Sequence, residues 1–496
     1  MKVEEYRRAA VSGARWTIAS RVALQLFTWP VTILVMRLLD PSDYGLFALA
    51  LVVSGFVALF AELGLGVALV QADEARPELQ RAASSLILVL NSFVAALLLL
   101  GAPLVARAFD EPDLTPIVQL LTLDLLLTAI GAVPQAMLER GLRFRELSLA
   151  QMSAGIVGSA TTLTVALLDY GVQSLVAGLL AQGVVRAALL IRFHGSLVWP
   201  GRVNAALVRP MIHVSGHVIA SRSLWYWHGQ SDLVVLGRML SSSVLGLYNV
   251  GAQLAMLPAG KAMEAINRVA FPILSRLRSE SAALTVVHRR LVALLALYGF
   301  GICWGLAAVA PEFVHVVLGE KWLVAAWPLA CLSFIAPLRM LCSLHNTITT
   351  ALGAPEAATK ELVLASLAIP AAVAYGAWAY GLPGASLAWP VVYPLVYLVS
   401  NRLTCRVIGV GMWMGVRPLV APIGAGMAMQ ASVWLVGAAL GTQTSPALLL
   451  AVEVPVGGAT YLGVLWLTAR PLLREALDLV RQLFDRPRPA GDGAPA

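Results

Sequence analysis

The sequence predicts an all-α membrane protein with about fourteen transmembrane helices, and three observations lead to this fold class. Of the 496 residues, 59% are hydrophobic and only 12% are charged, and the mean hydropathy is +0.80. Apolar stretches of about 20 residues, the length that crosses a bilayer as a helix, recur from Ala14 almost to Thr468. Part of the chain also repeats at a constant distance. We therefore expect no soluble domain.

Short charged or Pro/Gly-rich breaks separate the predicted spans. The basic N-terminus precedes an apolar stretch that is too long for a signal peptide, so we expect it to remain as the first helix. An even number of spans places both tails on one side of the membrane. The spans begin near Gly13, Tyr44, Ala82, Thr115, Leu147, Val172, Val214, Gly246, Leu291, Leu323, Leu362, Gly384, Val416 and Ala447.

Basic residues indicate which side faces the cytoplasm, because loops rich in Lys and Arg stay inside. With the N-terminus inside, 24 Lys and Arg residues fall in inner segments, and four fall in outer segments: Arg37, Arg107, Arg238 and Lys321. This bias predicts an inner-membrane protein with both termini in the cytoplasm. The net charge of +8 therefore reflects topology, and we expect no nucleic-acid partner.

Two segments between or after the spans mix basic and apolar residues, as helices lying in the membrane interface do. They are residues 138–147 (LERGLRFREL) and residues 472–484 (LLREALDLVRQLF). The closing residues, RPRPAGDGAPA, have the composition of a disordered tail.

An internal repeat with an offset of 201 residues divides the chain. Residues 18–21 (IASR) recur as residues 219–222, and in the same register Arg37 matches Arg238 and Gly45 matches Gly246. Span one thus aligns with span seven in a parallel repeat, the arrangement in which two lobes of a transporter rock about a central site. The predicted parts are an N-lobe (1–200), a C-lobe (201–410), two extra helices (411–470) and a cytoplasmic tail (471–496).

Seven basic residues fall inside predicted spans, where each costs about 2.5 to 3.5 kcal/mol unless it reaches water or a partner. Arg15, Arg186 and Arg268 lie near a predicted cytoplasmic end and are expected to extend to the interface. Arg21, Arg222 and Lys261 lie deeper and favour a solvated central cavity; the seventh is Arg339.

Polar residues at helical spacing accompany these charges. They could line the cavity or only hold helices together, as small polar residues do. We take as candidate substrate-binding residues Arg21, Gln25, Arg222, His217, His228, Lys261, Arg339 and Asn346, and as candidate coupling residues Glu62, Asp124, Asp232 and Glu264. A surplus of cations favours an anionic substrate such as a diphosphate.

The four cysteines give no sign of a metal site or a disulfide framework. Cys303, Cys331, Cys342 and Cys405 lie in or beside apolar spans and lack C-x-x-C spacing. Buried apolar packing explains them, and we expect no metal, cofactor or catalytic residue.

Residues 37–71, RLLDPSDYGLFALALVVSGFVALFAELGLGVALVQ, resemble the oligosaccharide flippase family of bacterial polysaccharide biosynthesis proteins. That family belongs to the superfamily of multidrug exporters and peptidoglycan lipid flippases. The resemblance continues through residues 138–151 and 245–277 and weakens towards the C-terminus. It implies a two-lobed helical fold and alternating-access transport of polyprenyl-diphosphate-linked sugar units to the outer leaflet, with membrane lipids and the polysaccharide polymerase and export machinery as further partners.

Three alternatives stay open. A membrane glycosyltransferase or polymerase could use Asp40 and Asp43 as catalytic carboxylates, but turn chemistry around Pro41 also explains both residues. A cation-coupled multidrug exporter requires the opposite sign of cavity charge. A scaffold without transport would not need the repeat.

Overall fold

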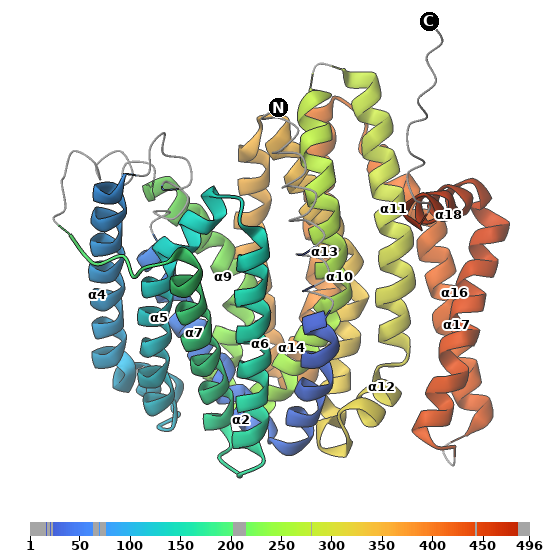
Figure 1. Ribbon diagram of the computed structural model, residues 1–496. Helices are drawn as coiled ribbons and strands as arrows, with labels where there is room; N and C mark the ends of the chain where they lie inside the picture. The colour runs from blue at the N-terminus through green and yellow to red at the C-terminus, as the bar shows by residue number, and fades with distance from the viewer. Residues whose placement is uncertain are drawn as a thin grey trace, which may run out of the picture. The chain divides into compact units, whose positions relative to one another are not determined.

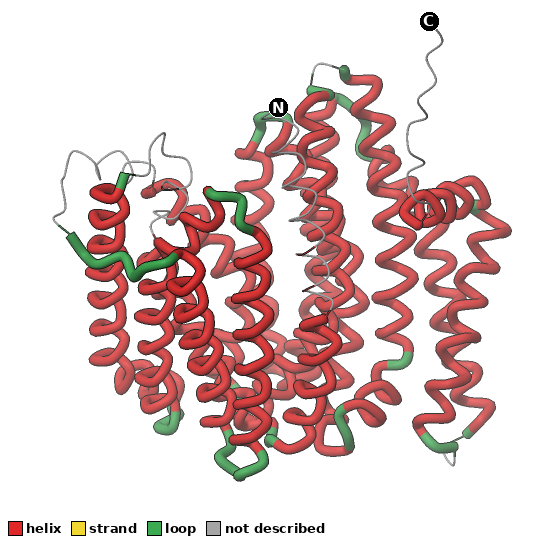
Figure 2. Tube along the Cα trace, in the orientation of Figure 1, coloured by secondary structure: helices red, strands yellow, loops and turns green. Residues whose placement is uncertain are grey.

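The computed structural model describes residues 16, 20, 23–62, 69, 76–201, 215–278, 280–441 and 444–484, and the regular structure in these ranges is helical (Figure 2). Ten of the described helices are long and apolar enough to cross a membrane. The chain is therefore an all-α, multi-pass membrane protein, as predicted. The count of fourteen crossings stays a prediction.

The described helices coincide with the predicted spans. The first is seen over Ala23–Leu38. It is followed by α2 (Pro41–Glu62), α4 (Pro77–Phe109), α5 (Leu114–Arg140), α6 (Phe144–Ala166), α7 (Val172–His194), α9 (Ser215–Met239), α10 (Ser242–Arg276), α11 (Ser281–Ala308), α13 (Ala326–Ala351), α16 (Val420–Leu440) and α17 (Pro446–Thr468). Helices α9 and α10 are more polar than the ten membrane candidates, because they carry the histidines and charges that the sequence places there.

Predicted spans eleven and twelve are joined in α14 (Pro355–Ile408), which changes direction at Gly381. The φ of +63° at this residue lies in the left-handed region that glycine adopts without strain. Shorter elements are α12 (Ala310–Val317), the 3-10 turn η1 (Glu320–Ala325), α15 (Trp413–Val416), η2 (Arg417–Leu419) and α18 (Arg470–Phe484).

One of the two predicted interfacial helices is wrong. Residues 138–140 continue α5, and α6 begins at Phe144 after a tight turn in which Leu142 has a φ of +54°. The amide of Arg143 donates to the carbonyl oxygen of Leu138 at 3.0 Å and closes that turn. The other segment does form a helix, α18; the last twelve residues lie outside the described ranges.

Two compact units divide the chain. Unit 1 comprises residues 1–250, 317–322 and 373–385, and unit 2 comprises residues 251–316, 323–372 and 386–496. In unit 1, α4, α5, α6 and α7 run up and down beside one another (Figure 1). The predicted lobe boundaries stay predictions.

Small residues let α6 and α7 approach closely. A Cβ at Gly158 would lie 2.9 Å from the carbonyl oxygen of Gly178, and a Cβ at Gly178 would overlap the hydroxyl of Thr162. Such contacts replace the hydrophobic driving force, which is missing between helices in lipid. They fix α7, which carries several polar side chains described below.

The internal repeat is visible as a reciprocal contact in unit 1. Helices α2 and α10 begin at Pro41 and Ser242, 201 residues apart. A Cβ at Gly45 would overlap the carbonyl oxygen of Ser242, and a Cβ at Gly246 would overlap the carbonyl oxygen of Pro41. Gly45 thus contacts Ser242, the repeat equivalent of Pro41. Gly246 in turn contacts Pro41, the repeat equivalent of Ser242. This exchange of equivalent residues is the signature of a local two-fold axis.

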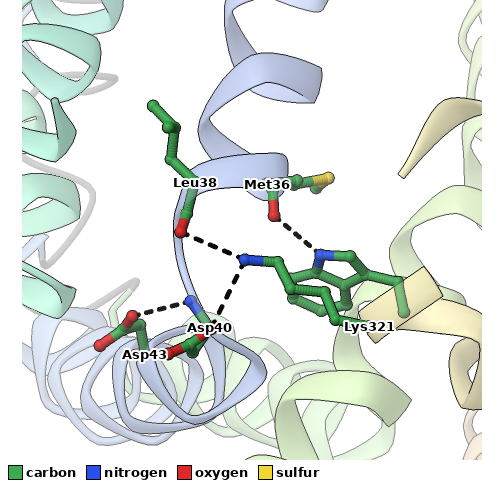
Figure 3. Close-up of polar contacts among 6 residues, drawn as sticks. Met36, Leu38, Asp40, Asp43 and Lys321 are labelled. Carbon is green, nitrogen blue, oxygen red and sulfur yellow. Dashed lines mark hydrogen bonds and ion pairs between the residues drawn. The ribbon is translucent and has the colours of Figure 1, made fainter. Parts of the chain in front are cut away.

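Polar contacts surround the start of α2 (Figure 3). The Asp43 carboxylate accepts a hydrogen bond from the amide of Asp40 at 3.0 Å and so caps the helix. The Lys321 ammonium donates to the carbonyl oxygen of Leu38 at 3.1 Å and lies 3.5 Å from the Asp40 carboxylate. The Trp322 indole donates to the carbonyl oxygen of Met36 at 2.7 Å. We call these residues the Asp40 cluster.

In unit 2, the last two predicted spans pack against α11. The Gln430 amide on α16 donates to the carbonyl oxygen of Trp304 at 2.9 Å, and the Tyr461 hydroxyl on α17 donates to that of Leu297 at 2.7 Å. The Trp304 indole in turn donates to the carbonyl oxygen of Phe334 on α13 at 2.7 Å. These bonds attach the hairpin that lies outside the repeat.

Candidate functional site

A polar pocket of about 470 Å³ lies inside unit 1, among helices α4, α5, α7 and α9. Its volume is within the range of small-molecule sites. Its polar lining residues are Asn91, Asp124, Thr128, Gln135, Glu139, Gln182, Arg186 and Arg222. Charged and amide side chains inside a membrane unit mark a functional site by default, because burying them in lipid is costly.

Helical spacing explains how α5 supplies half of this lining. Asp124, Thr128, Gln135 and Glu139 are separated by 4, 7 and 4 residues, a spacing that keeps them on one face. The Gln135 amide donates to the Glu139 carboxylate at 2.8 Å, so the two side chains lie along the helix. The rest of that face is small or apolar, which leaves room for the pocket.

Helix α7 presents Gln182 and Arg186 to the same space, one turn apart. The Arg186 guanidinium donates to the Gln135 side-chain oxygen at 2.7 Å and lies close enough to Asp124 for an attractive interaction. A Cβ at Gly183 would lie 2.9 Å from the Asp124 carboxylate, so this carboxylate rests against the backbone of α7. Arg186 therefore joins α5 and α7 at the polar centre of the pocket.

The described charges of this pocket are balanced. Its lining contains two carboxyl groups, of Asp124 and Glu139, and two guanidinium groups, of Arg186 and Arg222. The sequence predicted a surplus of cations in the cavity. The pocket instead offers both donors and acceptors, which suits a ligand that carries hydroxyl groups as well as an anion.

Two predicted site residues, Arg222 and Asp124, line the pocket together. Three others in unit 1 lie apart from its lining. Gln25 is half-buried on Ala23–Leu38, whereas His228 and Asp232 are buried on α9. The Asp232 carboxylate accepts hydrogen bonds from the Tyr248 hydroxyl at 2.7 Å and from the amide of Leu233 at 2.9 Å. The bond to Tyr248 connects α9 to α10, and the coupling role of Asp232 stays a prediction.

Four predicted residues lie in unit 2. Lys261 and Glu264 are exposed on α10. Arg339 on α13 stacks over the Trp389 ring, with its guanidinium carbon 4.9 Å from the ring centre. Asn346 forms a side-chain hydrogen bond with the buried Glu361 of α14.

The surroundings of Arg339 and Asn346 form a second polar cluster. His345 of α13 is fully buried and hydrogen-bonds the Ser400 hydroxyl of α14 at 3.2 Å. Its ring lies 5.9 Å from that of His288 on α11, which is also fully buried. The sequence analysis selected Arg339 and Asn346 but neither histidine, although His345 directly precedes Asn346 and His288 directly precedes Arg289 and Arg290.

Three further predicted residues lie in parts of the chain that the structure does not describe in full. Arg21 itself is not among the described residues. His217 and Glu62 belong to α9 and α2, but their side chains are not described. Their proposed roles stay predictions.

The sequence prediction misplaced or missed six of the polar pocket residues, among them Asn91 and Thr128. Arg186 was expected to extend to the interface, but it lines the pocket. Gln135, Glu139 and Gln182 were not singled out. The spacing of Gln182 to Arg186 and of Gln135 to Glu139, both i to i+4, was the available signal.

The two aspartates that could have been catalytic have other roles. Asp43 caps α2, and Asp40 lies beside Lys321. A helix cap therefore accounts for the Asp43 carboxylate, and an ion pair accounts for the Asp40 carboxylate.

Comparisons with known proteins agree with this architecture. Residues 34–327 match the family model described as polysaccharide biosynthesis protein. The chain is 25% identical to the teichuronic acid biosynthesis protein TuaB of Bacillus subtilis, over 92% of this chain and 95% of that protein. It is 27% identical to the succinoglycan biosynthesis transport protein ExoT of Rhizobium meliloti, over 96% of each. The lipopolysaccharide biosynthesis protein WzxC of Escherichia coli is 26% identical over 64% of each chain.

Solved structures show the fold. The lipid II flippase MurJ in an inward closed conformation matches with a TM-score of 0.73 and 12% identity, over 93% of this chain and all of that one. An inward-facing multidrug transporter of the MATE family matches with a TM-score of 0.64 and 13% identity, over 78% of this chain and 94% of that one. The family model covers more than half of the sequence, and the chain therefore belongs to the polysaccharide biosynthesis protein family.

Proposed function

We propose that this protein is a flippase that moves polyprenyl-diphosphate-linked oligosaccharides from the cytoplasmic to the outer leaflet by alternating access. The observation that carries the proposal is the polar pocket of unit 1, in which Arg186 and Arg222 stand among carboxylate and amide side chains. The names of the relatives, a succinoglycan transport protein and a lipid II flippase, support this substrate class.

The chemistry of such a substrate suits the pocket lining. A diphosphate that leaves water needs charge-assisted hydrogen bonds, which a guanidinium supplies in planar pairs. Sugar hydroxyls both donate and accept, so Gln135, Gln182 and Asn91 match them. We assign the phosphate contact to Arg222 and the sugar contacts to the network around Arg186.

The other predicted residues keep proposed roles in the same transport cycle. Gln25, His228, Arg339 and Asn346 are proposed to contact the substrate in other states of the cycle, as are Arg21, His217 and Lys261. Asp124 is the coupling candidate that lines the pocket. Glu62, Asp232 and Glu264 are further candidates, and the hydrogen bonds of Asp232 make it the weakest.

Complementation of a flippase-deficient strain tests the proposal. We expect Arg222→Gln and Arg186→Gln each to reduce surface polysaccharide at least ten-fold while membrane abundance stays near that of the wild type; a ten-fold effect corresponds to about 1.4 kcal/mol. Arg192→Gln is the matched control, because Arg192 is exposed in the last turn of α7. Full export by both pocket variants would refute the assignment of the pocket.

The predicted orientation can be tested by cysteine labelling, because the four native cysteines are buried. A membrane-impermeant maleimide should label Pro112→Cys, in the loop between α4 and α5, in intact cells. It should label Ser196→Cys, after α7, only once the membrane is opened. The reverse pattern would invert the topology and the proposed direction of transport.

A cation exporter is the second candidate, because Asp124 and Glu139 place two carboxylates in the pocket. Such an activity predicts that Asp124→Asn abolishes efflux of a cationic dye such as ethidium. The flippase proposal predicts no dye efflux above that of cells without the protein.

A further inference from the structure

The end of α17 carries exposed aromatic and apolar side chains. Trp466 is 44% exposed in its last turn, and Leu462, one turn earlier, is 52% exposed. The spacing of four residues keeps both on one face. Tryptophan prefers the boundary between the hydrocarbon and the polar headgroups, so this face marks where the helix leaves the membrane core.

Two arginines of α18 converge on the Trp466 ring. Helix α18 follows α17 after the single residue Ala469 and lies across its end (Figure 1). The guanidinium carbons of Arg470 and Arg474 lie 5.5 and 5.9 Å from the ring centre. Arg470 also donates through Nε to the carbonyl oxygen of Trp466 at 2.7 Å.

Other contacts hold α18 in this position. Leu473, between the two arginines, is buried. Glu475 forms an ion pair with Arg290 of α11. The helix is therefore fixed to both α17 and α11, and the two guanidinium groups keep their place at the membrane boundary while their side chains stay exposed.

We propose that Trp466, Arg470 and Arg474 bind the phosphate headgroup of an acidic membrane phospholipid. Two guanidinium groups on one ring repel each other, and an anion between them replaces repulsion by charge-assisted hydrogen bonds. The ring neutralises only part of this charge through its negative face. An acyl chain of the same lipid would lie along Leu462, on the face below Trp466. This site is separate from the transport pocket.

Native mass spectrometry of the delipidated full-length protein tests the site. Phosphatidylglycerol should bind more tightly than phosphatidylcholine with the same acyl chains. Arg470→Gln and Arg474→Gln should each weaken phosphatidylglycerol binding about five-fold, since an arginine at the membrane surface contributes about 1 kcal/mol. Arg474→Lys should retain most of the binding because the charge is kept. Arg406→Gln, at an exposed arginine in the last turn of α14, should leave binding unchanged.

Competition identifies the source of the phosphate. The proposal expects phosphatidylglycerol to remain bound in the presence of equimolar farnesyl diphosphate or inorganic phosphate. Displacement by farnesyl diphosphate would assign the site to a polyprenyl substrate and overturn the proposal, and displacement by inorganic phosphate would reduce it to an unspecific anion site. Equal binding of both phospholipids, or wild-type binding by the two Gln variants with unchanged thermal midpoints, would also refute it.

Discussion

The two copies of the repeat use the same backbone contact but different side chains around it. At the crossing of α2 and α10, Gly45 and Gly246 occupy equivalent places and contact equivalent carbonyl groups. The ends of the helices differ. Asp43 caps α2 from within the helix, whereas the amide of Ser242 at the start of α10 donates to Glu111, in the loop before α5, at 3.2 Å.

The matching arginines differ in the same way. Arg37 donates to the carbonyl oxygen of Val317 at 2.9 Å, whereas Arg238 forms an ion pair with Asp110. Val317 is the last residue of α12, which follows the third helix of the second copy, and Asp110 directly follows the third helix of the first copy, α4. The close backbone crossing thus has glycine in both copies. The matching arginines also occupy equivalent positions, but one binds a backbone carbonyl and the other a carboxylate.

The crossing glycines should give the largest effect. We expect Gly45→Ala and Gly246→Ala each to destabilise the protein by about 3 kcal/mol, because the added Cβ overlaps a backbone carbonyl that cannot move alone. Membrane abundance and the thermal midpoint in detergent measure this. Gly101→Ala, where the Cβ meets open space in α4, is the control and should be neutral or stabilising.

The double variant sharpens the comparison. Once one Cβ has separated the helices, the second costs less, so the combined loss should be smaller than the sum. Strictly additive losses would mean that the two glycines are independent and that the crossing is not reciprocal.

The two caps should rank next. Asp43→Ala and Glu111→Ala should each cost about 1 kcal/mol, since each leaves a helix-terminal amide without its acceptor. Asp113→Ala is the matched control, because Asp113 shares the loop of Glu111 and makes no side-chain cap bond. If Asp43→Ala lowered the thermal midpoint and Glu111→Ala did not, the bond from Ser242 to Glu111 at the start of α10 would not contribute to stability.

The arginines should separate by salt dependence. Arg238→Gln removes an ion pair whose side chains are 59% and 71% exposed, so its cost of about 0.5 kcal/mol should vanish in 1 M salt. Arg37→Gln removes a bond to a backbone carbonyl, and its effect should persist in salt. Thermal midpoints at low and high salt decide this, and equal salt dependence would contradict the assigned partners.

Lys321→Gln should have the smallest effect. Its ammonium is 3.5 Å from the Asp40 carboxylate, and that carboxylate is 73% exposed, so the loss should be about 0.3 kcal/mol. Trp322→Phe is the useful contrast, because it removes a 2.7 Å bond from a fully buried indole. A larger loss for Lys321→Gln than for Trp322→Phe would show that the Lys321 contacts, to Asp40 and to the carbonyl oxygen of Leu38, contribute more than the Trp322 bond.

Much of the fold could be predicted from the sequence, because apolar length alone identifies membrane helices. The repeat was also readable, since Gly45 and Arg37 keep their register with Gly246 and Arg238. The turn at residues 141–143 was not, because an interfacial helix and a helix end with basic residues have the same composition. Only the φ of Leu142 separates the two.

The site was predictable only in part. Arg222 and Asp124 were identified because a charge deep in an apolar span needs a polar neighbour. Arg186 was misjudged, since its distance from the predicted helix end suggested water, whereas the packing of α5 against α7 supplies Gln135 as its partner. The sequence shows how far a residue lies from the end of a span. It does not show which neighbouring helix faces that residue and supplies its partner.

The reciprocal crossing of α2 and α10 has a consequence for the origin of the chain. In an isologous dimer, the same pair of residues meets twice, once from each subunit. The contacts of Gly45 with Ser242 and of Gly246 with Pro41 have this form, because the residues of one pair are the repeat equivalents of the other. Duplication and fusion of a half-length gene whose product paired as a homodimer would leave this arrangement. In such an ancestor, a single mutation at the glycine would have placed two methyl groups on the symmetry axis at once. In the fused chain the two glycines are separate positions, so a single mutation adds one methyl group at the crossing.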